Sequence, residues 1–298
     1  MTVLEISGAK IAGAPISWGV CEVPGWGHQL STDRVLREMR QAGLAATELG
    51  PAGLLPADPM ALRGLLDGYG VDCVGTFAPA VLHRAGHDPL KDVAAALGSI
   101  VATGASTLVL AAASGADGYD SRPVLDAGQW ATLLANLDRI AAHSTDHGVT
   151  AVLHPHVGTM VETAEDVDRV LSGSMVPLCL DTGHLLIGGS QPLELARAFA
   201  DRVAHVHLKD VDAALAAQVR SGEMTYTRAV ARGMYTPLGS GDVDIAGIVT
   251  ALLGNGFDGW FVLEQDTILD GAPRGRGPLR DVLASVAYLT GVLAGIPA

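Results

Sequence analysis

The feature that most constrains the fold of this chain is the regular alternation of short β-rich runs with helical stretches along its whole length. The β-rich runs cover residues 10–18, 45–49, 71–77, 106–112, 150–155, 176–181, 203–209 and 259–264. Helical patterns separate them: one begins at Ser31 or Thr32 and ends at Gly43, another ends at Gly148, and a third begins at Thr163. Strands that alternate with helices in this way predict a parallel sheet.

Eight such strands in 298 residues fit a closed (β/α)8 barrel in both number and length. The alternative is an open, doubly wound sheet, which would favour a glycine-rich phosphate loop after the first strand. The residues in that place read PISWGVCEV (15–23) and do not form such a loop. No linker rich in proline, serine or glycine divides the chain, so we predict one α/β domain, a single TIM barrel over residues 1–298.

Residues 93–116 carry no charge and are numerous enough to cross a bilayer. The segment is rich in small residues and is interrupted at Thr103-Gly104, so we interpret it as a buried helix followed by a buried strand. The opening MTVLEISGAK shows no secretory signal, and the three cysteines form no CxxC motif. We therefore expect a reduced, cytoplasmic setting.

The charge of the chain narrows the range of its partners. It has 19 basic and 32 acidic residues, which gives a formal net charge of −13. Such a surface repels phosphate backbones and anionic lipids, so we expect neither nucleic acid nor membrane as a partner. A small molecule remains as the expected partner, and the sequence leaves the oligomeric state open, a homo-oligomer included.

Polar residues gather at the ends of the last four predicted strands, where the active site of a parallel barrel lies. The residues are His154 and His156 on the fifth strand, Asp181 on the sixth, His205, His207 and Lys209 on the seventh, and Glu264 on the eighth. Each alone has an ordinary explanation, such as a rim histidine or a helix-capping aspartate. Together they predict a site for one divalent ion, because unpaired buried charge is costly and an ion would neutralise both carboxylates.

Several segments of the sequence resemble the xylose isomerase-like superfamily of TIM barrels, which contains sugar isomerases and epimerases. Within it, the closest likeness is to inosose dehydratases, which dehydrate 2-keto-myo-inositol. The segments that carry the resemblance are HPHVGTMVETAEDVDRV (154–170), LDTGHL (180–185), HVHLKD (205–210), RGMYTPLGSGDVDI (232–245) and GWFVLEQD (259–266). The sequence departs from its relatives at His154, where sugar epimerases carry a glutamate, and at Pro155, where the dehydratases carry a histidine.

The resemblance implies roles for the polar residues of the barrel rim. The metal-ligand positions are taken by His154, Asp181, His207 and Glu264. We expect Glu264 or His184 as the catalytic base, and Lys209 or a metal-bound water as the acid. The expected substrate contacts are Trp18, Glu48, His156, His184 and Lys209. We also expect His156 and His205 to hold the ligands in orientation.

A set of two imidazoles and two carboxylates favours Mn²⁺ or Co²⁺, with Fe²⁺, Zn²⁺ and Mg²⁺ as other candidates. An ion with open positions would chelate a hydroxyketone, polarise its carbonyl and make its α-proton acidic. Loss of a β-hydroxyl then completes a dehydration. Epimerisation requires two opposed bases, and His154 replaces one of the two carboxylates, so we predict a metal-dependent hydro-lyase that acts on an inosose.

Other functions are alternatives at this point. A keto-sugar or cyclitol isomerase or epimerase would use the same metal site, and a lyase of 3-keto-glycosides differs only in the leaving group. A metal-dependent phosphodiesterase acting on DNA would need several ions and a basic groove, which the net charge of −13 opposes. A barrel that only binds a ligand is the remaining alternative.

Residues 211–241, after the seventh strand, are long for a connection between a strand and a helix. We expect them to form a lid-like insertion over the site, with Arg232 and Tyr235 facing substrate hydroxyls. Closure of such a lid would exclude water from the reaction. The alternative is a helical insertion with no part in the reaction.

Overall fold

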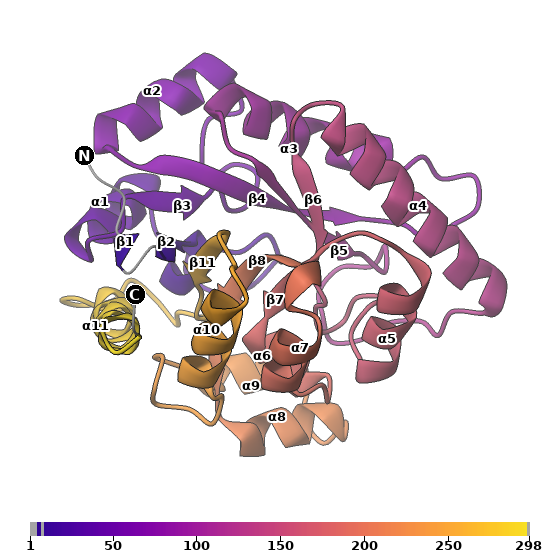
Figure 1. The fold of residues 1–298 in the computed structure, drawn as a ribbon. Helices are drawn as coiled ribbons and strands as arrows, with labels where there is room; N and C mark the ends of the chain where they lie inside the picture. Colours follow the sequence, from indigo (N-terminus) through magenta and orange to yellow (C-terminus); the bar gives the residue numbers. More distant parts are fainter. Residues whose placement is uncertain (1–4, 7–8, 297–298) are drawn as a thin grey trace.

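Eight parallel strands among the described residues, 5–6 and 9–296, close into a barrel in the computed structural model (Figure 1). In chain order they are β2 (Ala9–Gly13), β3 (Ala46–Glu48), β4 (Asp72–Ala80), β5 (Thr107–Ala112), β6 (Thr150–Leu153), β7 (Leu178–Asp181), β8 (Val203–Leu208) and β11 (Trp260–Leu263). The order around the barrel is β2-β11-β8-β7-β6-β5-β4-β3, and Gly13 pairs with Thr47 to close it. The predicted TIM barrel is confirmed, and each predicted run overlaps one of its strands. A further strand, β1 (Glu5–Ile6), pairs with β2 in the antiparallel sense.

Helices connect the strands and cover the outside of the barrel (Figure 1). They are α1 (Thr32–Gln41), α2 (Pro59–Tyr69), α3 (Leu90–Thr103), α4 (Ala127–Thr145), α5 (Ala164–Gly173), α6 (Thr182–Ile187), α7 (Pro192–Ala198), the short η2 (Ala200–Arg202), α10 (Ile245–Gly254) and α11 (Leu279–Ala294). Side chains that accept from free backbone N–H groups fix several of their starts. Ser31 caps α1 and Thr163 caps α5, so both predicted starts are confirmed.

The uncharged segment 93–116 folds as a helix and a buried strand, but the helix is buried on one face alone, at Val93, Leu97 and Ile100, and Val101 is 52% exposed. Helix α3 ends at Gly104, whose φ of 75° favours glycine, and every side chain of β5 is buried. Parallel strands that are covered on both faces are apolar throughout, which explains the missing charge. In the part of the chain that the structure describes, no helix is both long and apolar enough to cross a membrane.

One predicted strand is too long. Strand β2 ends at Gly13, and a 3-10 turn, η1 (Pro15–Trp18), follows where the prediction continued the strand to Trp18. Pro15 has no N–H to donate to a ladder and begins the turn, and Gly19 ends it with a φ of 75°. Trp18 is therefore packed in the core, where its Nε1 donates to Glu38 of α1 at 2.8 Å.

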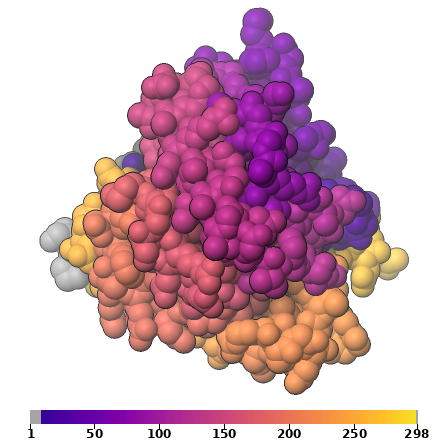
Figure 2. Space-filling view, turned by 90° about the vertical axis from the view of Figure 1, so that its right-hand side faces the viewer, coloured from indigo at the N-terminus to yellow at the C-terminus, as the bar shows by residue number. Residues whose placement is uncertain are grey.

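The segment after β8 forms a small unit of its own. It begins with β9 (Asp210–Val211), passes through α8 (Ala213–Arg220) and α9 (Tyr226–Ala231), and returns through β10 (Tyr235–Thr236), which pairs with β9. The buried carboxylate of Asp210 holds the end of this unit, because it accepts the N–H groups of Gly239 and Gly241. The space-filling view shows the unit, in orange, projecting at the lower edge of the molecule (Figure 2). Its movement as a lid stays a prediction.

Candidate metal centre and active site

The inward face of the barrel changes from apolar to polar at the carboxyl ends of β6, β7 and β11. Inside the barrel, the fully buried residues of these strands are Val152, Cys179 and Val262. Side chains two residues apart share one face of a strand. The inward face therefore continues to His154, Asp181 and Glu264, which follow two residues later. On β8, His207 pairs in register with Asp181.

Asp181 lies at the centre of the four predicted metal ligands. Its Oδ2 is 3.0 Å from Nε2 of His154 and 3.6 Å from Nδ1 of His207. The same Nδ1 lies 3.1 Å from Oε2 of Glu264. One ligand atom from each of Asp181, His207 and Glu264 lies within 4.8 Å of the others. The structure thus brings the four side chains together, each of them at most 9% exposed.

The residues in this cluster fit a divalent cation. Nδ1 of His207 is buried and has no hydrogen-bond partner among the described residues, although carboxylate oxygens of Asp181 and Glu264 face it. Buried polar atoms in proteins are nearly always paired, so an unpaired one that faces two carboxylates indicates a place for an ion. Two imidazole nitrogens and two carboxylate oxygens match the preferences of first-row divalent ions.

Glu48 lies behind His207. Its Oε1 accepts hydrogen bonds from Nε2 of His205 at 2.8 Å and from Nε2 of His207 at 2.9 Å. Burial opposes the charge of Glu48, but the two imidazoles outweigh it and lower the pKa of the carboxyl. Because this carboxylate holds Nε2–H of His207, the other nitrogen, Nδ1, would be available to bind an ion. Glu48 was predicted as a substrate contact. In the structure it also orients His207, one of the predicted metal ligands.

Lys209 is a buried ammonium among carboxylates. Its Nζ lies 2.9 Å from Asp266, 3.0 Å from Glu264 and 3.4 Å from Asp181. Burial alone would lower the pKa of Lys209, yet these carboxylates raise it well above its ordinary value, so the amine stays protonated. Nζ also donates to Nε2 of His184 at 3.0 Å. Burial and the neighbouring positive groups lower the pKa of His184, which keeps its imidazole neutral behind Lys209.

His156 borders the cavity above these residues. Its Nδ1 donates to the carbonyl oxygen of Val157 at 2.7 Å, so Nε2 of the neutral ring carries a lone pair. Burial lowers the pKa of His156 well below its ordinary value. The ring stacks on that of His184, with 3.7 Å between the centroids. His154 and His207 also border the cavity, whereas His184 does not, so His156 is the imidazole beside the predicted metal ligands that a substrate in the cavity would meet.

Three further residues of the cavity wall had no predicted role: Tyr119, Tyr226 and Asp266. Tyr226, on α9, donates to Asp266 and lies 3.1 Å from the hydroxyl of Tyr235. Tyr119 donates to Glu22 and so joins two loops that are distant in sequence. The strand period does signal Asp266, two residues beyond Glu264, but no sequence pattern connects the tyrosines to the barrel rim.

The predicted substrate contacts fall into two groups. Glu48, His156 and Lys209 border the cavity, and Tyr235 adjoins them through its ring, whose centroid is 5.4 Å from Nζ of Lys209. Trp18, His184 and Arg232 do not border it, and His184 instead contacts Lys209. Trp18 is held in the core by the 3-10 turn, and Arg232 is exposed at the end of α9.

A closed parallel barrel with a buried polar cluster at the carboxyl ends of its strands defines the TIM barrel class of enzyme folds. Within that class, the chain belongs to the xylose isomerase-like TIM barrel family, whose model matches residues 36–283. It is therefore an enzyme of this family with a buried group of residues able to bind a metal.

Individual proteins of known name are similar to the chain over most of its length. It is 33% identical over 270 residues to inosose dehydratase from Geobacillus kaustophilus (strain HTA426), which covers 86% of this chain and 87% of the relative. It is 35% identical over 272 residues to the rhizopine catabolism protein MocC of Rhizobium meliloti, which covers 86% of this chain and 81% of the relative. A solved structure of the IOLI protein with a bound zinc atom matches the fold with a TM-score of 0.70 at 13% identity, covering 97% of this chain and 99% of that one.

The different contacts of His154 and His156, just after β6, predict different effects of their substitution on metal retention. His154 reaches Asp181, whereas His156 donates to the backbone. We expect His154→Ala to lower the metal content of the purified protein well below one equivalent, and His156→Ala to lower it less. Metal analysis after dialysis measures both contents. The reverse order would identify His156 as the ligand.

The position of Glu48 predicts a second effect on the metal. We expect Glu48→Gln to weaken metal affinity about 10–100-fold, because His207 loses the charged partner that fixes its orientation. Competition with a chelator measures the affinity. Glu22→Gln is the matched control, since Glu22 borders the same cavity but pairs with Tyr119. Equal losses in the two variants would contradict the role given to Glu48.

Proposed function

We propose that the chain is a metal-dependent hydro-lyase that removes water from a keto-cyclitol, with 2-keto-myo-inositol, an inosose, as its substrate. The 33% identity with a relative named inosose dehydratase, over most of both chains, supports the proposal. The observation that carries it is that His156 and Lys209 border one cavity beside the metal cluster, with Nδ1 of His156 bonded to the backbone and Nζ of Lys209 held by His184. A dehydration needs such a pair, a base at the α-carbon and a proton donor at the departing oxygen.

The metal cluster would bind the ketone of the substrate. A divalent ion held by His154, Asp181, His207 and Glu264 would act as a Lewis acid on the carbonyl. Among the ions that suit this mixed set of ligands we propose Mn²⁺ or Co²⁺. Glu48 keeps His207 turned toward the ion.

Side chains of this protein carry the proton transfers. Nε2 of His156 takes the α-proton, because Nδ1 of the same ring is committed to the backbone. Nζ of Lys209 donates to the departing hydroxyl, which leaves as water. His184 accepts a hydrogen bond from Nζ and Asp266 faces it, so both hold the ammonium in place.

The segment from β9 to β10 takes part through α9. Tyr226 of this helix donates to Asp266, which in turn lies 2.9 Å from Nζ of Lys209. We propose that the segment closes over the substrate as a lid and that Tyr226 sets the position of the proton donor when it does so. Exclusion of water would protect the enolate from competing proton transfer.

Epimerisation is less well supported, because it needs a base on each face of one carbon. The residue that follows β6 is the imidazole His154, and the residue that follows β11 is the carboxylate Glu264. These two positions therefore supply one carboxylate and not the two of a two-base pair. The cluster is also one unit more positive with a neutral imidazole than with a carboxylate at this place. A more positive site favours the developing negative oxygen of an elimination.

Dione formation from 2-keto-myo-inositol tests the reaction. We expect the natural protein, saturated with Mn²⁺ or Co²⁺, to form the dione, which NMR in deuterated water detects together with exchange at the α-carbon. His154→Glu restores the second carboxylate, and we expect it to lose dehydration far more than metal. If the natural protein exchanges and inverts the α-carbon without ever releasing water, the reaction is an epimerisation.

The identity of the base has its own test. We expect His156→Gln to lower α-carbon exchange and dione formation about 10²–10⁴-fold, because an amide cannot take the proton. Metal content should stay close to that of the natural protein. His147→Gln, at an exposed histidine after α4, is the control and should change neither rate. Exchange at the full rate in His156→Gln would exclude His156 as the base.

A further inference from the structure

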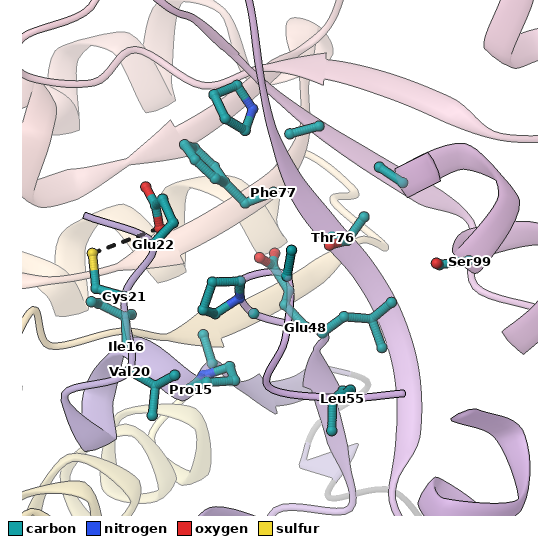
Figure 3. A pocket seen from close by; sticks show the side chains of 18 of the residues that line it. Pro15, Ile16, Val20, Cys21, Glu22, Glu48, Leu55, Thr76, Phe77 and Ser99 are labelled. Carbon is teal, nitrogen blue, oxygen red and sulfur yellow. Dashed lines mark hydrogen bonds between the residues drawn. The ribbon is translucent and has the colours of Figure 1, made fainter. Parts of the chain in front are cut away.

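The cavity above the metal cluster is much longer than its polar end. Its volume is about 590 Å³, and it continues past Glu48 between residues 49–59, β4 and α3. Figure 3 shows the extent: Glu22 and Phe77 lie on one side, Thr76 and Ser99 on the other, with Glu48 between them. The polar residues that would bind and convert the substrate therefore occupy one end of a larger space.

The other end is lined mainly by apolar side chains, with Thr76 and Ser99 beside them, and we call it the apolar annexe. It is made of Leu49, Pro51, Leu55, Pro56, Leu62, Ala78, Ala95 and Ala96. The annexe exists because β3 ends at Glu48 while β4 continues to Ala80, so the chain turns away from the sheet at Leu49. The small residues of α3 that border this gap do not fill it.

The annexe offers no free charge to a ligand. Asp92 is the charged residue of α3 that borders the cavity, and it already pairs with Nε2 of His87 at 2.7 Å. The same carboxylate accepts the N–H of Val81 at 2.9 Å. A ligand group that enters the annexe therefore exchanges water for carbon atoms, which favours an apolar group.

Free 2-keto-myo-inositol is too small and too polar to account for this space. The molecule has twelve non-hydrogen atoms. A water molecule occupies about 30 Å³ in the liquid, and at that generous volume for each atom the molecule would fill only about 360 Å³. Every ring carbon carries an oxygen, so none of its surface matches the annexe. The remaining volume is large enough for a group of several carbon atoms.

We propose that the natural substrate is a keto-cyclitol ether or keto-glycoside whose alkyl or aryl group occupies the apolar annexe while its ring lies at the metal cluster. This inference rests on the proposed function and specifies its substrate class. The elimination stays balanced: the α-proton passes to His156, the C–H electron pair becomes the C=C bond, and the β-oxygen leaves with its bonding pair and takes a proton from Lys209. The product is water where that oxygen is a hydroxyl, and an alcohol or phenol where it carries the apolar group.

Binding of a homologous series tests the annexe without requiring turnover. The probes are methyl, butyl and hexyl β-D-glucopyranoside, titrated by calorimetry into the metal-loaded protein. We expect each added methylene to tighten Kd about fourfold, as full burial of a methylene predicts. An affinity that does not change along the series would overturn the proposal.

A pair of variants on α3 locates the effect. Ala94 and Ala95 are both exposed, but Ala95 borders the annexe and Ala94 lies outside it. We expect Ala95→Phe to fill the annexe and bring the hexyl-to-methyl affinity ratio close to one, and Ala94→Phe to leave that ratio as it is in the natural protein. Equal ratios in the two variants would mean that the alkyl group binds elsewhere. A change of oligomeric state in Ala95→Phe with an unchanged ratio would assign the annexe to a second copy of the chain and overturn the proposal.

The two proposals fail separately. A protein that forms the dione but shows no gain along the alkyl series has the proposed reaction and no substituent site. A protein that shows the gain but never forms a dione from 2-keto-myo-inositol or from its butyl ether has the annexe and a different reaction, which overturns the proposed function and leaves the binding result intact.

Discussion

The balance of buried charge is the constraint on which this site depends. The carboxylates of Glu48, Asp181, Glu264 and Asp266 are all buried within one mouth of the barrel. Each needs a positive or hydrogen-bonding partner, because an unpaired buried charge costs on the order of several kcal/mol. The ammonium of Lys209 faces Asp181, Glu264 and Asp266, whereas Glu48 accepts hydrogen bonds from the imidazoles of His205 and His207. A divalent ion bound among them would add positive charge to this group of carboxylates.

Asp181 connects this balance to the fold. Its Oδ1 accepts the N–H groups of Gly183 and His184 at 2.9 and 2.7 Å and so starts α6, while its Oδ2 faces the other ligands. Helix capping and metal binding, which look like alternatives in the sequence Asp-Thr-Gly-His, would use different oxygens of one side chain. The first turn of α6 also brings His184 to Lys209, so the same carboxylate positions the group that holds the ammonium.

Much of the fold and the centre of the site follow from the sequence because both depend on short-range periods. The two-residue period of a strand places His154, Asp181 and Glu264 on the inward face once the barrel is assumed. Effects that depend on depth or on distant loops could not be predicted. Strand β3 has only 3 residues, too few to show that Glu48 would meet His207 instead of the substrate. Tyr226 reaches the site because α9 packs over it, and the spacing of residues in the sequence does not predict that packing.

The brevity of β3 has a consequence for how such a barrel changes over evolutionary time. The side chains of the proposed reaction lie at or just after the ends of β6, β7, β8 and β11, whereas residues 49–59, after β3, form one wall of the cavity. Insertions and deletions in that loop leave the hydrogen-bond ladder and the ion site intact. Related barrels can therefore share one reaction and differ in substrate. We expect the sequence differences that set the substrate to lie in the loop after the second barrel strand.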